Sequence, residues 1–426
     1  MAIAAPSSHR LRSALNFSAT WLSFIIRLVG QLGYFLLVAR GLGPHDYGMV
    51  ASVFALLIVF GSFSSWGSDH LMIRAVTAAP ERFRDYFGNA LAMTAATALP
   101  LGLLVFAAQS IAVGMAPLPF AAFALGELFF TRLLACSVGC FMAFERGGDL
   151  FAVNSFFSLM RLATCVAAIL LSHPLTLEIW AQWYLAGVAF SGVAVIAYTV
   201  WRLGPPRWYV ARHEIGLGFH FCLLYTADAA VRDIDKPIVA YFAGAAAAGI
   251  YNAAFRIVDA VTMPMRALAA SFYARFFRHG HQGIERSFQF ALKVLPITLG
   301  YAIFAGLMLT FGAQFLPLLL GEKFRAAAPV TGALALLPVF WGLTSLGGDI
   351  LTSAGRQRSR ALVMVCLSLS PVVLSCLLVP RFGAIGAAYA SLGNAALVTA
   401  TIWTLVLLSL RRAARADAPN AARAPV

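Results

Sequence analysis

Apolar stretches long enough to cross a lipid bilayer recur along the whole chain. Of its 426 residues, 61% are hydrophobic and only 11% are charged, which is typical of a polytopic membrane protein and excludes an ordinary soluble enzyme. Because a membrane-spanning helix needs about 20 apolar residues, the pattern predicts an all-α protein with twelve spans. We expect these at residues 17–39, 47–66, 87–109, 119–143, 150–171, 179–201, 218–242, 249–270, 288–312, 328–352, 361–379 and 384–410.

The distribution of basic residues predicts how these spans are oriented. Most of the 31 Lys and Arg residues fall on the same side as the N-terminus, and the positive-inside rule makes that side cytoplasmic. They include Arg74, Arg82, Arg84, Arg202, Arg207, Arg212, Arg356, Arg358, Arg360, Arg411 and Arg412, whereas the opposite side holds Arg40, Lys323, Arg325 and Arg381. Both termini are therefore predicted to be cytoplasmic. Contact with anionic lipid head groups accounts for the net charge of +14 without a nucleic-acid partner.

The two halves of the chain resemble each other. A shift of 201 residues matches Gly43 with Gly244, Gly48 with Gly249 and Phe54 with Phe255. A weaker match pairs residues 143–153 with 353–363, which are both short charged turns that enter an apolar span. Two six-helix halves are a common plan for transporters, with the substrate path between them. We therefore expect a cytoplasmic N-terminus at 1–16, an N-lobe at 17–202, a cytoplasmic linker at 203–217, a C-lobe at 218–411 and a disordered cytoplasmic tail at 412–426.

A polar stripe runs along the first predicted span. Its members are separated by three or four residues, so they share one helix face; they are Asn16, Thr20, Ser23, Arg27, Gln31 and Tyr34. An arginine near the bilayer centre costs about 2.5–3.5 kcal/mol even on the lenient insertion scale. Such a group is retained where it faces water, a counter-charge or a ligand. The stripe thus predicts a polar cavity inside a helical bundle, and a cavity of this kind suggests transport.

Three later spans also place charged or polar residues on one face. The fifth span holds Asn154, Ser158 and Arg161, the seventh holds Tyr225, Asp228, Arg232 and Asp235 with Lys236 at the edge, and the eighth holds Asn252, Arg256, Asp259 and Arg266. Lys293 lies in the first turns of the ninth span. These residues are the remaining candidates for a cavity lining.

Several hairpins resemble those of polysaccharide transporters, the O-antigen flippase branch of the MATE-like superfamily. The segments are VARGLGPHDYGMVASVFALL near the start, DIDKPIVAYFAGAAAAGIYNAAFRIVD at the seventh and eighth spans, and VPRFGAIGAAYASLGNA at the last two. The resemblance implies two pseudo-symmetric six-helix lobes in a V shape. It also implies an inner-membrane flippase that moves an undecaprenyl-pyrophosphate-linked oligosaccharide for O-antigen or exopolysaccharide synthesis, with polysaccharide polymerase and chain-length machinery as partners.

A lipid pyrophosphate is a dense anion, and arginine suits it because the guanidinium stays charged and forms bidentate hydrogen bonds with phosphate oxygens. We expect Arg27, Arg161, Arg232 and Arg256 to form a cationic centre, with Lys293 attracting the head group at an inner gate. Thr20, Ser23, Gln31, Tyr34, Asn154 and Asn252 are the candidate polar lining. The alternative is structural: Asp228 lies four residues before Arg232, and Asp259 lies three after Arg256, so ion pairs along the helix can neutralise these arginines. Arg27 has no acid on its own helix.

Four acids are candidates for ion coupling: Glu127, Asp228, Asp235 and Asp259. A buried carboxylate can take up a proton on one side and release it on the other, or an acid pair can hold Na⁺. The sequence does not choose between H⁺ and Na⁺, nor between coupling and structural pairing. No phosphate-binding loop or metal-ligand cluster is present, so we expect no cofactor, no metal and no enzymatic activity. Two other functions are kept open: a cation-coupled exporter of small amphiphiles with the same fold, and a membrane O-antigen polymerase or ligase.

Overall fold

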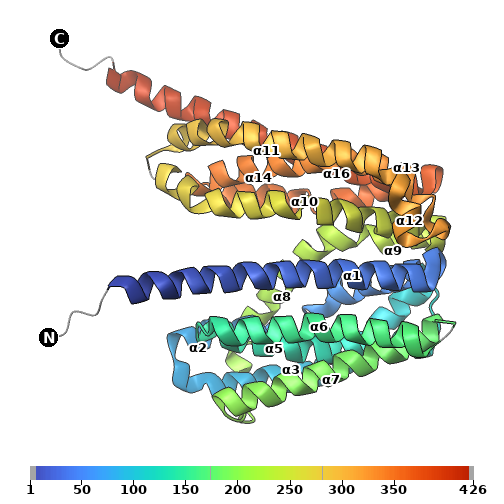
Figure 1. Ribbon diagram of the computed structural model, residues 1–426. Helices are drawn as coiled ribbons and strands as arrows, with labels where there is room; N and C mark the ends of the chain where they lie inside the picture. The colour runs from blue at the N-terminus through green and yellow to red at the C-terminus, as the bar shows by residue number, and fades with distance from the viewer. Residues whose placement is uncertain (1–5, 173, 281, 422–426) are drawn as a thin grey trace. The chain divides into compact units, whose positions relative to one another are not determined.

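The protein is described here by a computed structural model that covers residues 6–172, 174–280 and 282–421, with side chains for residues 30–413 apart from 173, 224, 227, 228, 274 and 281. Within these residues every regular element is helical (Figure 1). The chain forms two compact units, residues 1–233 and 234–426.

The described residues of unit 1 form eight α-helices. They are α1 (Pro6–Gly61), α2 (Ser68–Ala78), α3 (Phe83–Ala112), α4 (Pro117–Leu125), α5 (Thr131–Ala143), α6 (Gly147–Leu171), α7 (Leu177–Leu203) and α8 (Ile215–Asp233). A π-helical turn, Gly126–Phe130, joins α4 to α5. The core forms where α2, α3 and α5 bury Met72, Tyr86 and Cys140 against one another, and where α5, α6 and α7 pack around Phe141 and Val153.

Eight α-helices are likewise formed by the part of unit 2 that the structure describes. They are α9 (Asp235–Ala243), α10 (Ala245–Gly280), α11 (Ile284–Gly312), α12 (Leu316–Leu320), α13 (Ala327–Ala333), α14 (Leu337–Ser353), α15 (Gln357–Cys366) and α16 (Ser370–Ala421). Its core lies among α10, α11, α14 and α16, which pack around Phe276, Val294, Ile350 and Ile402.

All twelve predicted spans fall on helical segments. Helix α1 contains the first two predicted spans, which are separated by a break at Gly43. Helix α16 similarly continues through a break at Gly383, between the last two spans. Eight helical segments of the described chain are long and apolar enough to cross a membrane. The protein is therefore an all-helical, multi-pass membrane protein, while the exact count of twelve spans stays a prediction.

The backbone geometry supports the internal repeat. Gly43 has φ 78° and ψ 174°, and its match Gly244 has φ 87° and ψ 162°. This region of backbone space is essentially restricted to glycine, so both halves break a helix with the same conformation at the matched residue. The second match behaves likewise: Glu145 has φ 52° and Gly355 has φ 73°. The following residues, Arg146 and Arg356, each donate a backbone hydrogen bond to the fifth residue before them, at 2.9 and 2.8 Å.

The predicted linker 203–217 is folded onto unit 1. The backbone N–H of Arg207 donates to the carbonyl oxygen of Arg84 at 2.8 Å, and that of Ala211 donates to Asn89 Oδ1 at 2.9 Å. The Tyr86 hydroxyl donates to Glu214 at 2.9 Å. After this segment α8 packs against α1 and α2, which is why the division between the units falls at residue 233 rather than in the linker.

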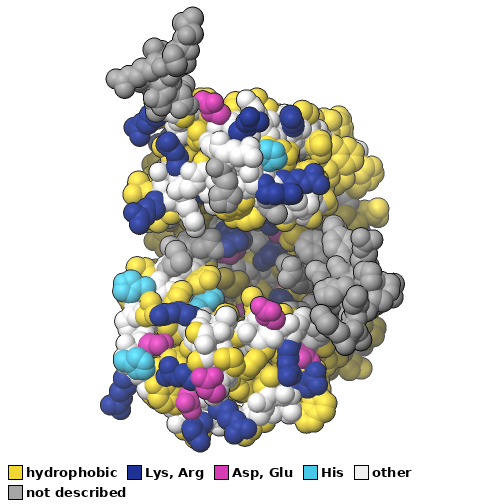
Figure 2. Space-filling view, turned by 90° about the vertical axis from the view of Figure 1, so that its left-hand side faces the viewer, with side chains coloured by type: hydrophobic (Ala, Val, Ile, Leu, Met, Phe, Trp, Pro, Cys, Tyr) yellow, Lys and Arg dark blue, Asp and Glu magenta, His cyan; other side chains and the backbone are white. Residues whose placement is uncertain are grey.

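Exposed Lys and Arg side chains are visible on the face that Figure 2 shows. Several members of the predicted cytoplasmic set are exposed in unit 1: Arg74, Arg82, Arg84, Arg202, Arg207 and Arg212. Arg358, Arg411 and Arg412 are exposed in unit 2. Such a distribution is expected where helix ends leave the membrane on the cytoplasmic side.

Candidate functional site

Part of the predicted polar stripe lies outside the described side chains. Thr20, Ser23 and Arg27 belong to α1, but their side chains are not described, and the same holds for Asp228 on α8. The roles predicted for these four residues therefore stay predictions. The stripe can be followed from Gln31, which is exposed, to Tyr34.

In unit 1, Tyr34 of α1 and Arg161 of α6 come together. The guanidinium carbon of Arg161 lies 4.1 Å from the centroid of the Tyr34 ring, and Tyr34 also packs on Trp180 of α7 with ring centroids 5.8 Å apart. A cation over an aromatic face is stabilised by about 2 kcal/mol or more when it is desolvated. Arg161 is thus held by an aromatic ring, and the described residues offer it no ion pair within 4.0 Å.

Glu127 lies in the π-helical turn next to this pair. It accepts a hydrogen bond from the hydroxyl of Tyr184 of α7. The Tyr184 ring sits directly on Gly126, where an added Cβ would lie 2.6 Å from Cε1. A larger residue at 126 would push the phenol away, so the glycine and the turn together position the carboxylate.

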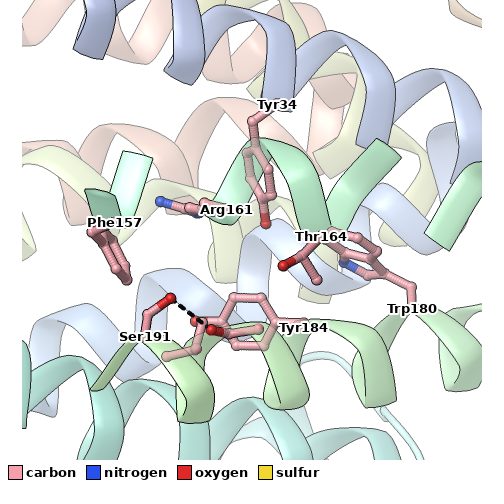
Figure 3. A pocket seen from close by; sticks show the side chains of 9 residues that line it. Tyr34, Phe157, Arg161, Thr164, Trp180, Tyr184 and Ser191 are labelled. Carbon is pink, nitrogen blue, oxygen red and sulfur yellow. Dashed lines mark hydrogen bonds between the residues drawn. The ribbon is translucent and has the colours of Figure 1, made fainter. Parts of the chain in front are cut away.

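A small cavity lies among these side chains (Figure 3). Its volume is about 10 Å³, and it is lined by Tyr34, Phe157, Arg161, Thr164, Trp180, Tyr184, Gly187, Val188 and Ser191. That volume suits about one water molecule and not a sugar. Arg161 Nε and Trp180 Nε1 are buried without a hydrogen-bond partner among the described atoms, so they are the donors that a single water or small polar atom can satisfy.

In unit 2, the predicted coupling acid Asp235 already has partners. Its Oδ1 lies 3.1 Å from Lys236 Nζ, and its Oδ2 accepts a hydrogen bond from the Tyr251 hydroxyl. Tyr251 in turn lies 2.7 Å from the hydroxyl of Ser391 on α16. Asp235 is 8% exposed and Lys236 only 2%. Lys236 Nζ also lies 4.9 Å from the centre of the Phe255 ring. This arrangement is a compact buried ion pair.

The ion pair between Asp259 and Arg256, which was the structural alternative to a cavity role for Arg256, is not observed among the described side chains. Asp259 Oδ1 instead lies 2.7 Å from a guanidinium nitrogen of Arg266, two helical turns further along α10. Arg266 is held there because its guanidinium also lies over the ring of Trp341 on α14, 5.3 Å from the centroid. Arg256 is half-buried, and among the described side chains it has neither a hydrogen bond nor an ion pair.

The remaining candidates are not gathered into these clusters. Arg232 and Lys293 are exposed. Asn154 is half-buried, and its amide donates to the carbonyl oxygen of Leu150 on its own helix at 2.9 Å. Asn252 is buried on α10. The four-arginine centre stays a prediction, because the Arg27 side chain is not described and Arg256 belongs to unit 2 whereas the other three arginines belong to unit 1.

One polar cluster was missed by the sequence reasoning. Asp149, at the start of α6, accepts hydrogen bonds from Tyr198 at 2.6 Å and from Arg202 at 3.2 Å, both on α7. Arg146 lies 3.7 Å away. The Arg146–Asp149 spacing of three residues was a signal for one of these contacts, but the two partners on α7 depend on helix packing.

Comparison with known proteins establishes the family. The family model described as polysaccharide biosynthesis protein matches residues 14–278. This match covers more than half of the chain, so the chain belongs to the polysaccharide biosynthesis protein family. A curated relative, the teichuronic acid biosynthesis protein TuaB of Bacillus subtilis, is 28% identical over 127 residues, which is 29% of this chain and 26% of TuaB. The match thus spans about a quarter of that relative's length.

Solved structures confirm the fold. An inward-facing multidrug resistance MATE family transporter of the MOP superfamily aligns with a TM-score of 0.70 and 14% identity, over 90% of this chain and 96% of that one. The lipid II flippase MurJ in an inward closed conformation aligns with a TM-score of 0.68 and 12% identity, over 92% of this chain and 87% of that one. The protein therefore has the MATE-like helical fold that the sequence predicted.

Proposed function

We propose that this protein is a flippase that moves an undecaprenyl-pyrophosphate-linked oligosaccharide repeat unit across the bacterial inner membrane by alternating access. Membership of the polysaccharide biosynthesis protein family supports a cargo from a polysaccharide pathway. Similarity in fold to a MATE transporter and to the lipid II flippase MurJ supports transport as the activity.

The observation that carries this proposal is that Arg256 is half-buried and has no ion pair among the described residues. The other charged groups near it on α9 and α10 are satisfied within unit 2, since Asp259 pairs with Arg266 and Asp235 pairs with Lys236. Arg256 is left half-buried without an acid among the described residues. An intramembrane arginine without a counter-charge is best explained by an anionic ligand or a water-filled cavity. We assign the same role to Arg27, which has no acid on its own span.

Complementation tests the proposal directly. A strain that lacks its O-antigen or exopolysaccharide flippase receives the wild type, Arg27→Ala, Arg256→Gln, or the control Arg381→Gln, which removes an exposed arginine. We expect the wild type and the control to restore surface polysaccharide, and the two test variants to restore less than about a tenth of it, because charge-assisted hydrogen bonds to the cargo are lost. Arg27→Lys separates charge from bidentate geometry.

Two results would overturn parts of this proposal. If the wild type restores no polysaccharide with any repeat unit tested but confers resistance to cationic drugs, the exporter is the better assignment. If Arg27→Ala and Arg256→Gln restore polysaccharide fully at matched expression, the arginines do not bind the cargo.

For ion coupling we propose Glu127. Asp235 and Asp259 each have a cationic partner within 3.1 Å, whereas Glu127 has the neutral hydroxyl of Tyr184 and, among the described residues, no ion pair. A carboxylate without a fixed counter-ion can exchange H⁺ or Na⁺ during a cycle. Proteoliposome transport driven by a proton or sodium gradient should lose its gradient dependence in Glu127→Gln. An unchanged dependence would remove Glu127 from the mechanism.

A further inference from the structure

A second and larger cavity lies elsewhere in unit 1. It has a volume of about 160 Å³ and is enclosed by the turn after α1, the start of α2, one residue of α5 and one face of α8. The lining residues are Ser62, Gly67, Asp69, His70, Arg132, Phe221, Cys222 and Tyr225. We call this cavity the α2–α8 pocket.

The walls of the α2–α8 pocket are held together by backbone contact. Gly67, with φ 66°, lies so close to α8 that an added Cβ would be 2.5 Å from the carbonyl oxygen of Gly218. The indole N–H of Trp66 donates to the carbonyl oxygen of Ile215 at 3.2 Å. Side-chain bulk cannot be tolerated at Gly67, so the turn and α8 form a fixed frame around the cavity.

Arg132 is the cation of this pocket. Its Nε is buried without a hydrogen-bond partner, and within the described part of the chain no carboxylate lies within 4.0 Å of it. The guanidinium rests against the backbone of Gly61, where an added Cβ would collide with it. The chain therefore keeps space for a guanidinium and leaves donors on it unused, although an unsatisfied buried polar group is costly.

The carboxylate that lines the pocket, Asp69, contacts side chains other than Arg132. Asp69 Oδ1 accepts a hydrogen bond from Ser65 at 2.9 Å, and Oδ2 lies 3.8 Å from His70 Nε2. The His70 ring stacks on Tyr225 of α8, with centroids 3.9 Å apart and planes within 5°. Asp69 thus has other partners and forms no ion pair with Arg132 within 4.0 Å, and the His70 imidazole is a second potential cation at the wall.

Size then restricts the ligand. Pockets that hold drug-sized ligands measure about 300–1,000 Å³, so a cavity of about 160 Å³ is too small for a sugar repeat unit but larger than one water needs. The unused donors of a guanidinium favour a planar or tetrahedral oxyanion, because the fork binds two oxygens at once. We propose that the α2–α8 pocket binds a phosphate-type oxyanion through Arg132, a residue that is not one of the proposed cargo arginines.

The phosphate group can come from inorganic phosphate or from a lipid head group, and the experiment separates the two sources. Purified full-length protein in detergent is titrated with inorganic phosphate by calorimetry. In parallel, protein in phosphatidylcholine nanodiscs with or without phosphatidic acid is analysed for bound lipid by native mass spectrometry. The variants are Arg132→Gln and Gly61→Ala, which displaces the guanidinium while keeping its charge. Arg74→Gln, an exposed arginine on α2 outside the pocket, is the matched control.

We expect the wild type and Arg74→Gln to bind either inorganic phosphate or phosphatidic acid. Both pocket variants should bind that same ligand at least about tenfold more weakly, because charge-assisted hydrogen bonds are lost or misplaced. Weaker phosphate binding by the variants in calorimetry identifies the free anion as the ligand, and weaker phosphatidic acid binding in nanodiscs identifies the lipid. The proposal is overturned if neither ligand binds the wild type, or if a folded pocket variant binds as tightly as the control. Size-exclusion chromatography establishes folding, and Gly61→Ala remains a test if Arg132→Gln does not fold.

Discussion

A cation rests on an aromatic ring in each unit of this protein. Arg161 lies over Tyr34 in unit 1, and Lys236 lies over Phe255 in unit 2. Under the shift of 201 residues, the ring partner Tyr34 corresponds to Asp235, the carboxylate that pairs with Lys236. Lys236 therefore has both a ring and a carboxylate beside it, whereas Arg161 has a ring and, among the described residues, no ion pair.

The Asp235–Lys236 pair gives a prediction at this scale. Lys236→Met should destabilise the protein by about 3–5 kcal/mol, because it leaves Asp235 buried without its cation. Adding Asp235→Asn should recover part of the loss, since no charge then remains. Thermal unfolding of the purified full-length protein measures both effects.

The control for this experiment is Lys293→Met, which removes an exposed lysine and should change stability by less than about 0.5 kcal/mol. A double variant no more stable than Lys236→Met alone would show that the lysine acts through packing and not through its charge.

Partners of single residues were the least predictable part of the candidate site. The sequence offered Arg256 as the neighbour of Asp259, because three residues along a helix are close in space. Arg266 is preferred since Trp341, from a helix far away in the sequence, holds its guanidinium in place. Tyr34 and Arg161 meet for the same kind of reason, through the packing of α1 against α6.

At the scale of helices and turns, hydropathy alone predicted the segments well, because apolarity over about 20 residues is a local property. It did not predict the π-helical turn at Gly126–Phe130, where the Tyr184 ring lies against Gly126. The boundaries of the predicted spans lie on either side of Gly43 and Gly244, and both glycines break a helix in a backbone conformation that other residues rarely adopt.

The break at Gly244 gives a second prediction. Gly244→Ala should lower stability by about 1–3 kcal/mol through backbone strain alone, because an added Cβ there meets no atom within 4 Å. Gly300→Ala is a matched control on α11, where the added Cβ also meets nothing and the helix is regular.

Alanine should be neutral or stabilising at residue 300 by up to about 1 kcal/mol, because it is the better helix former. Unfolding temperatures of the two variants, compared with the wild type, check this. Equal shifts in the two variants would argue against a conformational role for Gly244.

For the whole molecule, the exposed arginines give a prediction of topology. Reporter fusions after residues 205 and 412 should report the cytoplasm, and a fusion after residue 325 should report the opposite side, because the basic residues are concentrated on one side of the predicted spans. Alkaline phosphatase and green fluorescent protein activities measured on each fusion provide the readout. A fusion at 205 and a fusion at 325 that report the same side would contradict the predicted orientation.

The anchored segment between α7 and α8 also affects how this topology can be measured. It contains Arg207 and Arg212, which are exposed and are potential trypsin cleavage sites. A protease, however, needs a stretch of backbone to open before it cuts, and this stretch is hydrogen-bonded to Arg84 and Asn89 of α3. Slow digestion of this segment would therefore result from its hydrogen bonds to α3 and not from burial in the bilayer. A protease-protection assay alone could then not assign the segment to one side of the membrane.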